Sequence, residues 1–214
     1  MKKSNFNAAK EYVFNRLENE LPDNLYYHGF HHTRDYVLPD SEILGKMENI
    51  SKEDFLLLRT AALYHDTGFI EEYKKNEPIG KRIAEDSLPK FGYSNDQIDR
   101  IGKIIMATQM QIVGEELKQV PDKNDHLQKI MCDADLFYLG GDSSEFIIIS
   151  DNLRREMKEY GIPDKNPEEW DLGQPSFLES HSYFTDSAKN LRNKGKERNI
   201  NASKKLKRIL LSLD

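Results

Sequence analysis

The chain has 214 residues, of which 37% are hydrophobic and 32% are charged, and its formal net charge is -6. This length provides for one domain with a sizeable core, and we expect neither a signal peptide nor a membrane span, because no apolar run is long enough for either. The single cysteine, Cys132, excludes an internal disulfide, so we expect a cytoplasmic protein in a reducing compartment.

The first 40 residues predict two helices. Apolar residues recur at helical spacing from Phe6 to Leu21, and Pro22 closes that segment. A second helix is expected from Tyr26 to Leu38, where Pro39 stops it.

A third helix follows a predicted capping box. Ser51 begins it, with Asp54 three residues further on, and its apolar positions lead to the adjacent pair His65-Asp66. Gly68 suits the left-handed position that often follows a helix. A buried helix that ends on an imidazole and a carboxylate needs partners for both groups, because burying them unpaired is costly.

Helical patterns continue downstream with one interruption. A fourth helix is expected to start near Asn76, and Ser94 with Gln97 forms a capping box for a fifth. Residues 110–126 are polar and predict a long loop. The remaining expected elements are helices over 127–138, 143–160, 177–191 and 202–213, with a polar connection over 163–173. The sequence therefore predicts an all-α fold, a compact bundle whose helices cross.

The charge is concentrated near the end of the chain. Residues 189–208 hold nine Lys or Arg and one Glu, a local balance of +8 within a total of -6, which leaves -14 for the rest. Such a segment either meets a phosphate-bearing ligand, docks on the acidic body, or is a solvated helix face, and we favour the last interpretation.

Several histidines and aspartates fall on faces that should be buried. His28 and His32 are four residues apart and share one face of the expected second helix, where Asp35 is placed to accept a ring N–H from His32. His31 points away from that face. Taken singly, a histidine on a helix is more often structural than a ligand.

The combination of residues from three helices is more specific. Two imidazoles and two carboxylates form a nitrogen and oxygen ligand set for a divalent cation, and helices can bring such side chains together in a bundle core. Four protein ligands leave positions open on a six-coordinate ion, as a hydrolytic metal site requires. Asp135 joins the set because it lies at helical spacing within an apolar stripe, where a carboxylate is rarely unpaired.

Three stretches, residues 27–35, 65–68 and 133–136, resemble in order and spacing the H…HD…D signature of the HD-domain metal-dependent phosphohydrolases. The resemblance implies one HD-like domain over residues 1–214, with a signature-bearing core over about 20–145 and a helical extension over about 146–214. It implies one divalent ion per chain (Mn, Mg, Fe, Co, Ni or Zn). The implied metal ligands are His32, His65, Asp66 and Asp135, and Asp133 is the competitor for the last place.

The resemblance also implies hydrolysis of a phosphate ester, a monoester or diester of a nucleotide or similar small molecule, by water activated at the metal. His28 resembles the histidine of the Tyr-His-Asn motif of cyclic nucleotide phosphodiesterases, which protonates the leaving oxygen, although Gly29 replaces the asparagine here. Asp66 or Glu77 would accept the proton of the water. The expected partner is a small phosphorylated substrate, neither a nucleic acid nor a membrane.

Departures from the wider family narrow this expectation. Two-metal members carry further histidines at places that correspond here to Asn76 and Thr108, so we expect one metal ion and no diiron chemistry. Stringent-response hydrolases and 5′-deoxynucleotidases carry a glutamate where this chain has Phe69, which argues against both activities. Two alternatives stay open: a catalytically silent metal- or nucleotide-binding regulatory module, and an iron-dependent HD oxygenase, which the missing histidines disfavour.

The segment after residue 174 is rich in functional side chains. His181, Lys189 and Arg192 could close over the metal site and bind the substrate phosphate, since arginine presents a bidentate fork to such oxygens. The alternative, which we favour for this helix, is apolar packing with polar groups outside. Cys132 has no histidine at an activating spacing, so we interpret it as a buried residue and not a nucleophile.

Overall fold

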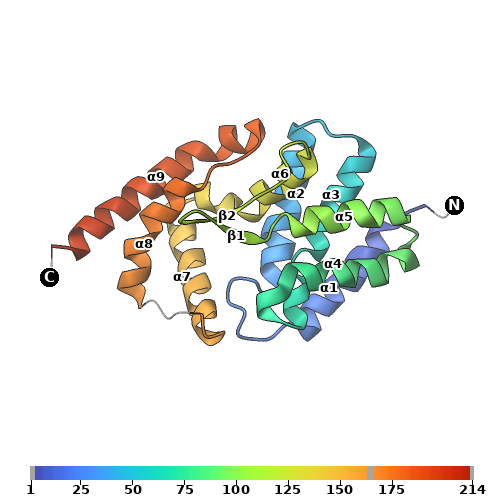
Figure 1. The fold of residues 1–214 in the computed structure, drawn as a ribbon, viewed down its shortest axis with the longest axis horizontal. Coiled ribbons are helices and arrows are strands. Elements are labelled where there is room, and N and C mark those ends of the chain that lie inside the picture. The colour runs from blue at the N-terminus through green and yellow to red at the C-terminus, as the bar shows by residue number, and fades with distance from the viewer. Residues whose placement is uncertain (1–2, 163–165, 213–214) are drawn as a thin grey trace.

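The computed structural model describes residues 3–162 and 166–212 and is built almost entirely from helices (Figure 1). The all-α prediction is therefore confirmed, with one two-stranded hairpin as the exception. The elements in chain order are α1 (Phe6–Glu20), η1 (His32–Val37, a π-helix), α2 (Leu38–Met47), α3 (Lys52–Tyr64), η2 (Thr67–Ile70), η3 (Tyr73–Lys75), α4 (Asn76–Ser87), η4 (Leu88–Phe91), α5 (Asn95–Met106), β1 (Met110–Val113), β2 (Glu116–Gln119), α6 (His126–Asp135), η5 (Phe137–Gly140), α7 (Ser143–Glu159), α8 (Pro167–Ser180) and α9 (Asp186–Leu210).

Helix α3 lies at the centre of the main core. Residues 61–64 on all sides of this helix are fully buried, and α1, α2, α4, α5 and α6 pack around it. A helix that is apolar all round is stable only inside such a bundle. Its amino-terminal end remains accessible, where the side chain of Ser51 accepts the N–H of Asp54 as expected. The core thus places Tyr64, the last residue of α3, and the following His65 and Asp66 in the protein interior.

The helix expected over 26–38 is wrong at both ends. Residues 26–29 are bends, helical structure begins at Phe30, and the chain continues through Pro39 to the end of α2. The reason is the π-helix before α2, in which the N–H of Leu38 donates to the carbonyl of Thr33, five residues back. Pro39 then falls in the first turn of α2, where its missing N–H is harmless.

Gly68 does not adopt the left-handed conformation predicted for it. Its role is close approach: a Cβ at this position would lie 1.9 Å from the carbonyl oxygen of Asn76. At Gly80 a Cβ would lie 2.8 Å from the carbonyl oxygen of Tyr64. These two glycines allow the turn after α3 to press against α4, and this contact brings Asn76 to the end of α3.

The predicted loop over 110–126 contains the β1–β2 hairpin. Its two-residue turn starts at Gly114, which has φ +66, as tight hairpin turns require. Ile112 is 80% exposed, so the strands lack the alternation of buried and exposed residues that identifies a strand from sequence. The register pairs Met110 with Gln119, which is buried at the end of β2.

The carboxyl-terminal helices differ from the prediction. The predicted helix over 143–160 is confirmed as α7, and the Ser94–Gln97 capping box is confirmed on α5. Most of the predicted connection over 163–173 is the start of α8, and residues 163–165 lie outside the described ranges. The helices predicted over 177–191 and 202–213 are instead the end of α8 and the continuous α9, with residue 213 also outside the described ranges.

Helices α7, α8 and α9 form a second group beside the main bundle (Figure 1). A smaller apolar cluster of Leu136, Leu139, Phe146 and Leu178 joins them to η5. Within the described ranges, none of the helices combines the length and the apolar character that crossing a membrane requires.

Candidate metal centre

Three residues from two elements form a buried cluster suited to a metal ion. His32 comes from the π-helix η1, while His65 and Asp66 follow directly on α3. One ligand atom from each lies within 4.8 Å of the other two, and each residue is at most 4% exposed. His65 Nε2 is 3.1 Å and His32 Nε2 is 3.7 Å from Oδ2 of Asp66.

Asp135, at the end of α6, faces the same cluster. Its Oδ1 lies 3.2 Å from His32 Nε2 and 3.6 Å from His65 Nε2. The structure therefore brings the four residues of the predicted ligand set together, from segments as far apart as 103 positions in the chain.

Asp133 points the other way and serves a structural role. It is fully buried, and its carboxylate accepts the N–H of Phe184 at 2.7 Å and both the N–H and the hydroxyl of Thr185 at 2.8 and 2.7 Å. Burial raises its pKa above the usual range, although these donors act in the opposite direction. Asp133, the competitor of Asp135 for the last ligand place, therefore has its oxygens engaged at the start of α9.

The ligand atoms of His65 and Asp66 are oriented by hydrogen bonds to the other polar atom of each side chain. His65 donates its Nδ1 proton to the carbonyl of Ala62 at 2.9 Å, which directs Nε2 toward the cluster. Asn76 donates to Oδ1 of Asp66 at 3.0 Å, which leaves Oδ2 free. These two atoms are buried and make no hydrogen bond, and they face each other at 3.1 Å. Since buried polar atoms without partners are costly, this donor set fits a bound cation.

Gln119 holds Asp135 in a similar way. Its Nε2 donates to Oδ2 of Asp135 at 2.6 Å and to the carbonyl of Thr108 at 3.0 Å. Each carboxylate of the cluster thus has one oxygen on a carboxamide and one oxygen facing the histidines. The sequence did not reveal Gln119, because it lies in a hairpin that we predicted as a loop.

The electrostatics of the cluster favour added positive charge. Burial lowers the pKa of His65, but the negative charge of Asp66 outweighs it and raises this pKa to about 9. Burial raises the pKa of Asp66, but the positive charge of His65 outweighs it and holds this pKa well below the usual range. The carboxylates therefore attract a cation to the cluster. Imidazole and carboxylate ligands suit the first-row divalent ions and magnesium alike.

His28 lies beside the cluster but for a different reason than predicted. His28 precedes the helix, so the prediction that it shares a helical face with His32 is wrong. The two rings are nevertheless close, with 5.8 Å between their centroids. Asp35, predicted to support His32, is exposed and paired with Arg34 at 2.7 Å. This pair lies on the outer surface of the helix, because the π-helix changes the register of its face.

Glu156 of α7 organises the surroundings of His28 and was not identified from the sequence. One oxygen accepts the N–H of Tyr27 at 2.8 Å and of His28 at 2.9 Å. The other contacts His28 Nδ1 and accepts the hydroxyl of Tyr73 at 3.0 Å. Burial lowers the pKa of His28, but Glu156 outweighs it and raises that pKa. The sequence does not separate Glu156 from the other acids of α7. Its burial, which depends on tertiary packing, sets it apart in the structure.

Glu77 lies in the first turn of α4, beside Asn76. Burial raises its pKa, and the charges of Asp66 and Asp135 raise it further, which indicates an electrostatic link with the cluster. Cys132 is buried and donates to the carbonyl of Ala107 at 3.1 Å, in agreement with its predicted structural role.

The three predicted substrate-binding residues make other contacts. Lys196 lies 3.4 Å from His181 Nδ1, and Lys189 donates to the carbonyl of Phe184 at 2.9 Å. The guanidinium of Arg192 lies 4.0 Å from the centre of the Phe137 ring. These contacts belong to α9 and the elements packed against it, and they involve none of the four cluster residues.

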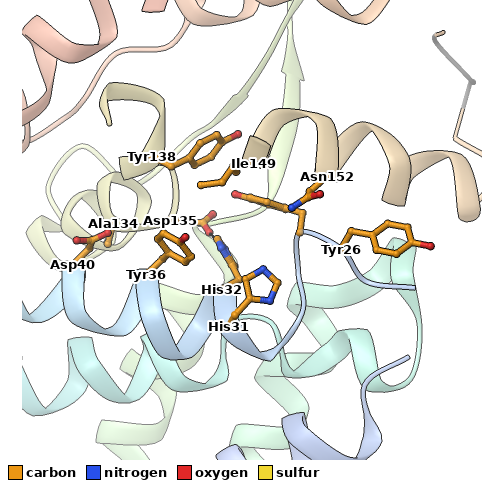
Figure 2. Close-up of a pocket in the computed structure, with 11 residues that line it drawn as sticks. Tyr26, His31, His32, Tyr36, Asp40, Ala134, Asp135, Tyr138, Ile149 and Asn152 are labelled. Carbon is orange, nitrogen blue, oxygen red and sulfur yellow. Dashed lines mark hydrogen bonds and ion pairs between the residues drawn. The ribbon is translucent and has the colours of Figure 1, made fainter. Parts of the chain in front are cut away.

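A pocket leads to the cluster from the side of α7 (Figure 2). His32 and Asp135 form its inner end, with Tyr36 on one side and Tyr138 and Asn152 on the other. Its volume is about 20 Å³, roughly the space for one water. No protein-family model, curated protein or solved structure matches this chain.

Proposed function

We propose that this chain is a single-domain HD-type phosphohydrolase that uses one divalent metal ion to hydrolyse a phosphate ester of a nucleotide or similar small molecule. The observation that carries the proposal is the buried pair of His65 Nε2 and Asp66 Oδ2, which lie 3.1 Å apart, make no hydrogen bond and face His32 and Asp135. His32, His65, Asp66 and Asp135 would hold the ion. When bound, the ion supplies acidity to a water and neutralises charge on the phosphoryl group.

The residues around the cluster supply the proton transfers. His28 would donate a proton to the leaving oxygen, because Glu156 raises its pKa and so favours the protonated form of the ring. Asp66 or Glu77 would accept the proton of the attacking water. Glu77 suits this role because its raised pKa makes it a stronger base than an ordinary carboxylate.

Metal analysis tests the ion-binding part of the proposal. We expect about one ion per chain, and His65→Ala and Asp66→Ala should each abolish binding, since both remove an inward-facing ligand atom. Asp35→Ala is the matched control, because this carboxylate is exposed and lies on the same helix as His32. A stoichiometry of two would overturn the one-metal assignment.

Catalysis is tested separately on the metal-loaded protein. A panel of phosphomonoesters, cyclic nucleotides and nucleoside triphosphates with Mn, Mg, Co and Ni should reveal hydrolysis, and His28→Ala should reduce it by about 10²-fold or more with metal content unchanged. Silence across the whole panel would refute the hydrolase and favour a binding module that keeps the metal frame.

A further inference from the structure

The metal cluster is closed to a substrate in this conformation. His65 Nε2 and Asp66 Oδ2 each have less than 1 Å² of exposed surface. The pocket that leads to the cluster reaches it at His32 and Asp135 and has room for about one water. A phosphoryl group is larger than a water molecule, so an ester cannot enter this pocket unless part of its wall moves.

Three parts of the chain form the wall of this pocket, and one of them carries no ligand of the proposed metal site. The first part lies within residues 26–40 and the second within residues 134–138, and each includes one ligand. The third part is α7, which contributes Ile149 and Asn152 (Figure 2). Since a movement of either of the first two parts would displace a ligand, α7 is the part that can open the pocket and leave the ligand set intact.

The two halves of α7 are held in different ways. In the amino-terminal half, Phe146 packs in the small apolar cluster beside η5, and Ser150 accepts the indole N–H of Trp170 at 2.8 Å. In the carboxyl-terminal half, residues 151–159, only Glu156 is buried. This half therefore lacks the apolar contacts that fix a helix firmly to a core, and such segments open locally at low cost.

Two residues, Glu156 and Tyr160, form a polar latch between this half of α7 and the main bundle. Glu156 accepts the N–H groups of residues 27 and 28 and the hydroxyl of Tyr73. Tyr160 donates its hydroxyl to Asn24 at 2.8 Å and stacks on the ring of Tyr73, with 4.0 Å between the ring centroids. All these polar groups regain hydrogen bonds to water when the contact opens, so the net cost of opening is modest.

We propose that the carboxyl-terminal half of α7 is a lid over the metal cluster, which the latch of Glu156 and Tyr160 holds shut and which swings away to admit the phosphate ester. The role in substrate entry rests on the proposed function, whereas the lid and its latch rest on the packing alone. When shut, the lid keeps bulk water away from the cluster.

Amide hydrogen exchange of the full-length, metal-free protein, followed by NMR, tests the lid without any ligand. The N–H groups of Tyr27 and His28 donate to Glu156, so both should exchange when the lid opens. Tyr160→Ala removes one hydrogen bond and one ring stack from the latch, and neither contact involves a cluster residue. This change should speed exchange at both amides by about tenfold and leave the core amides of α3 unchanged.

Glu159→Ala is the matched control, because it alters the exposed neighbour of Tyr160 and should leave exchange unchanged. Spin labels identify the part that moves, since the native Cys132 is buried. Between Glu159→Cys and Lys90→Cys, a population at longer distance should grow when Tyr160→Ala is added, whereas the distance between Asp23→Cys and Lys90→Cys should stay constant. Unchanged exchange in Tyr160→Ala, equal acceleration in α3 or in the control, or a shift of the Asp23 pair alone would overturn the lid.

Metal exchange then connects the lid with the cluster. In Tyr160→Ala the rates of manganese uptake and of its removal by a chelator should rise by the same factor of about ten, with Kd unchanged, because opening precedes both steps. A weaker Kd with an unchanged uptake rate would indicate a damaged ligand set and overturn the role of the lid in access. If exchange at residues 27 and 28 responds but no ester is hydrolysed, the lid stands and the hydrolase proposal fails. If esters are hydrolysed but this exchange does not respond, the hydrolase proposal stands and the lid fails.

Discussion

Two aspartates separated by one residue on α6 should differ in which property they lose on mutation, stability for one and metal binding for the other. Asp133→Ala removes the acceptor for three donors, the N–H groups of Phe184 and Thr185 and the Thr185 hydroxyl. Asp135→Ala removes the carboxylate that faces the two histidines. We expect the first change to destabilise the fold and the second to abolish metal binding.

The magnitude follows from the contacts of Asp133. A hydrogen bond to a charged group contributes about 1.5–3 kcal/mol, and a buried donor left unsatisfied costs about 1–3 kcal/mol. The hydroxyl of Thr185 can rotate to another partner, so the two backbone N–H groups carry most of the cost. Because burial raises the pKa of Asp133, the ionised carboxylate already bears a desolvation cost that its removal relieves. We therefore expect a loss of about 3 kcal/mol in the free energy of unfolding.

Urea denaturation of metal-free protein measures this loss, and thermal unfolding should show a Tm lowered by about 6–12 °C. Asp135→Ala should change the metal-free stability by less than about 1 kcal/mol, since the amide of Gln119 keeps its bond to Thr108. Its effect should be the loss of the stabilisation that added metal confers on the wild type. The reasoning is refuted if Asp133→Ala unfolds like the wild type, or if it loses metal binding while Asp135→Ala retains it.

Three further changes test other parts of the structure. Burial raises the pKa of Asp40 to about 6, so its carboxylate destabilises the folded state increasingly as the pH rises from about 4 to 6. Asp40→Asn should therefore stabilise the protein at pH 7 by about 2–3 kcal/mol in urea denaturation, and the gain should vanish below pH 4. Glu156→Gln should lower the pKa of His28 and move the alkaline limb of the pH–rate profile to lower pH, with metal content unchanged. Gly68→Ala should cost about 2 kcal/mol or more in thermal or urea unfolding, because the new methyl group meets the Asn76 carbonyl.

Each of these changes has a matched control. Asp35→Asn alters an exposed carboxylate and should leave stability within about 0.5 kcal/mol. Glu159→Gln alters an exposed acid of α7 and should leave the pH–rate profile unchanged. Gly102→Ala meets only the flexible side chain of Lys81 and should be neutral or stabilising by up to about 1 kcal/mol. An equal response of control and test variant would contradict the corresponding argument.

Local patterns in the sequence were sufficient for the fold class and for singling out His65-Asp66 and Asp135, whereas the choice of the full ligand set, with His32, followed from the resemblance to the HD-domain signature. Helical spacing identified the buried faces of α3 and α5, and the Ser94–Gln97 capping box marked the start of α5 correctly. His65-Asp66 stood out because a buried apolar helix ends on two polar side chains. Such signals are readable because they depend on neighbours within one or two helical turns.

The supports of the site were decided only by tertiary packing. Glu156 reaches the N–H of Tyr27 from 129 positions away, and Gln119 reaches Asp135 from a hairpin without a buried face. The opposite directions of Asp133 and Asp135 depend on where α9 begins, which no local pattern encodes. Periodicity tells which residues are buried, whereas the partner of a buried polar group depends on which distant segment packs against it. For this chain, the sequence alone therefore predicted the candidate ligands, and the tertiary structure determined what holds them in place.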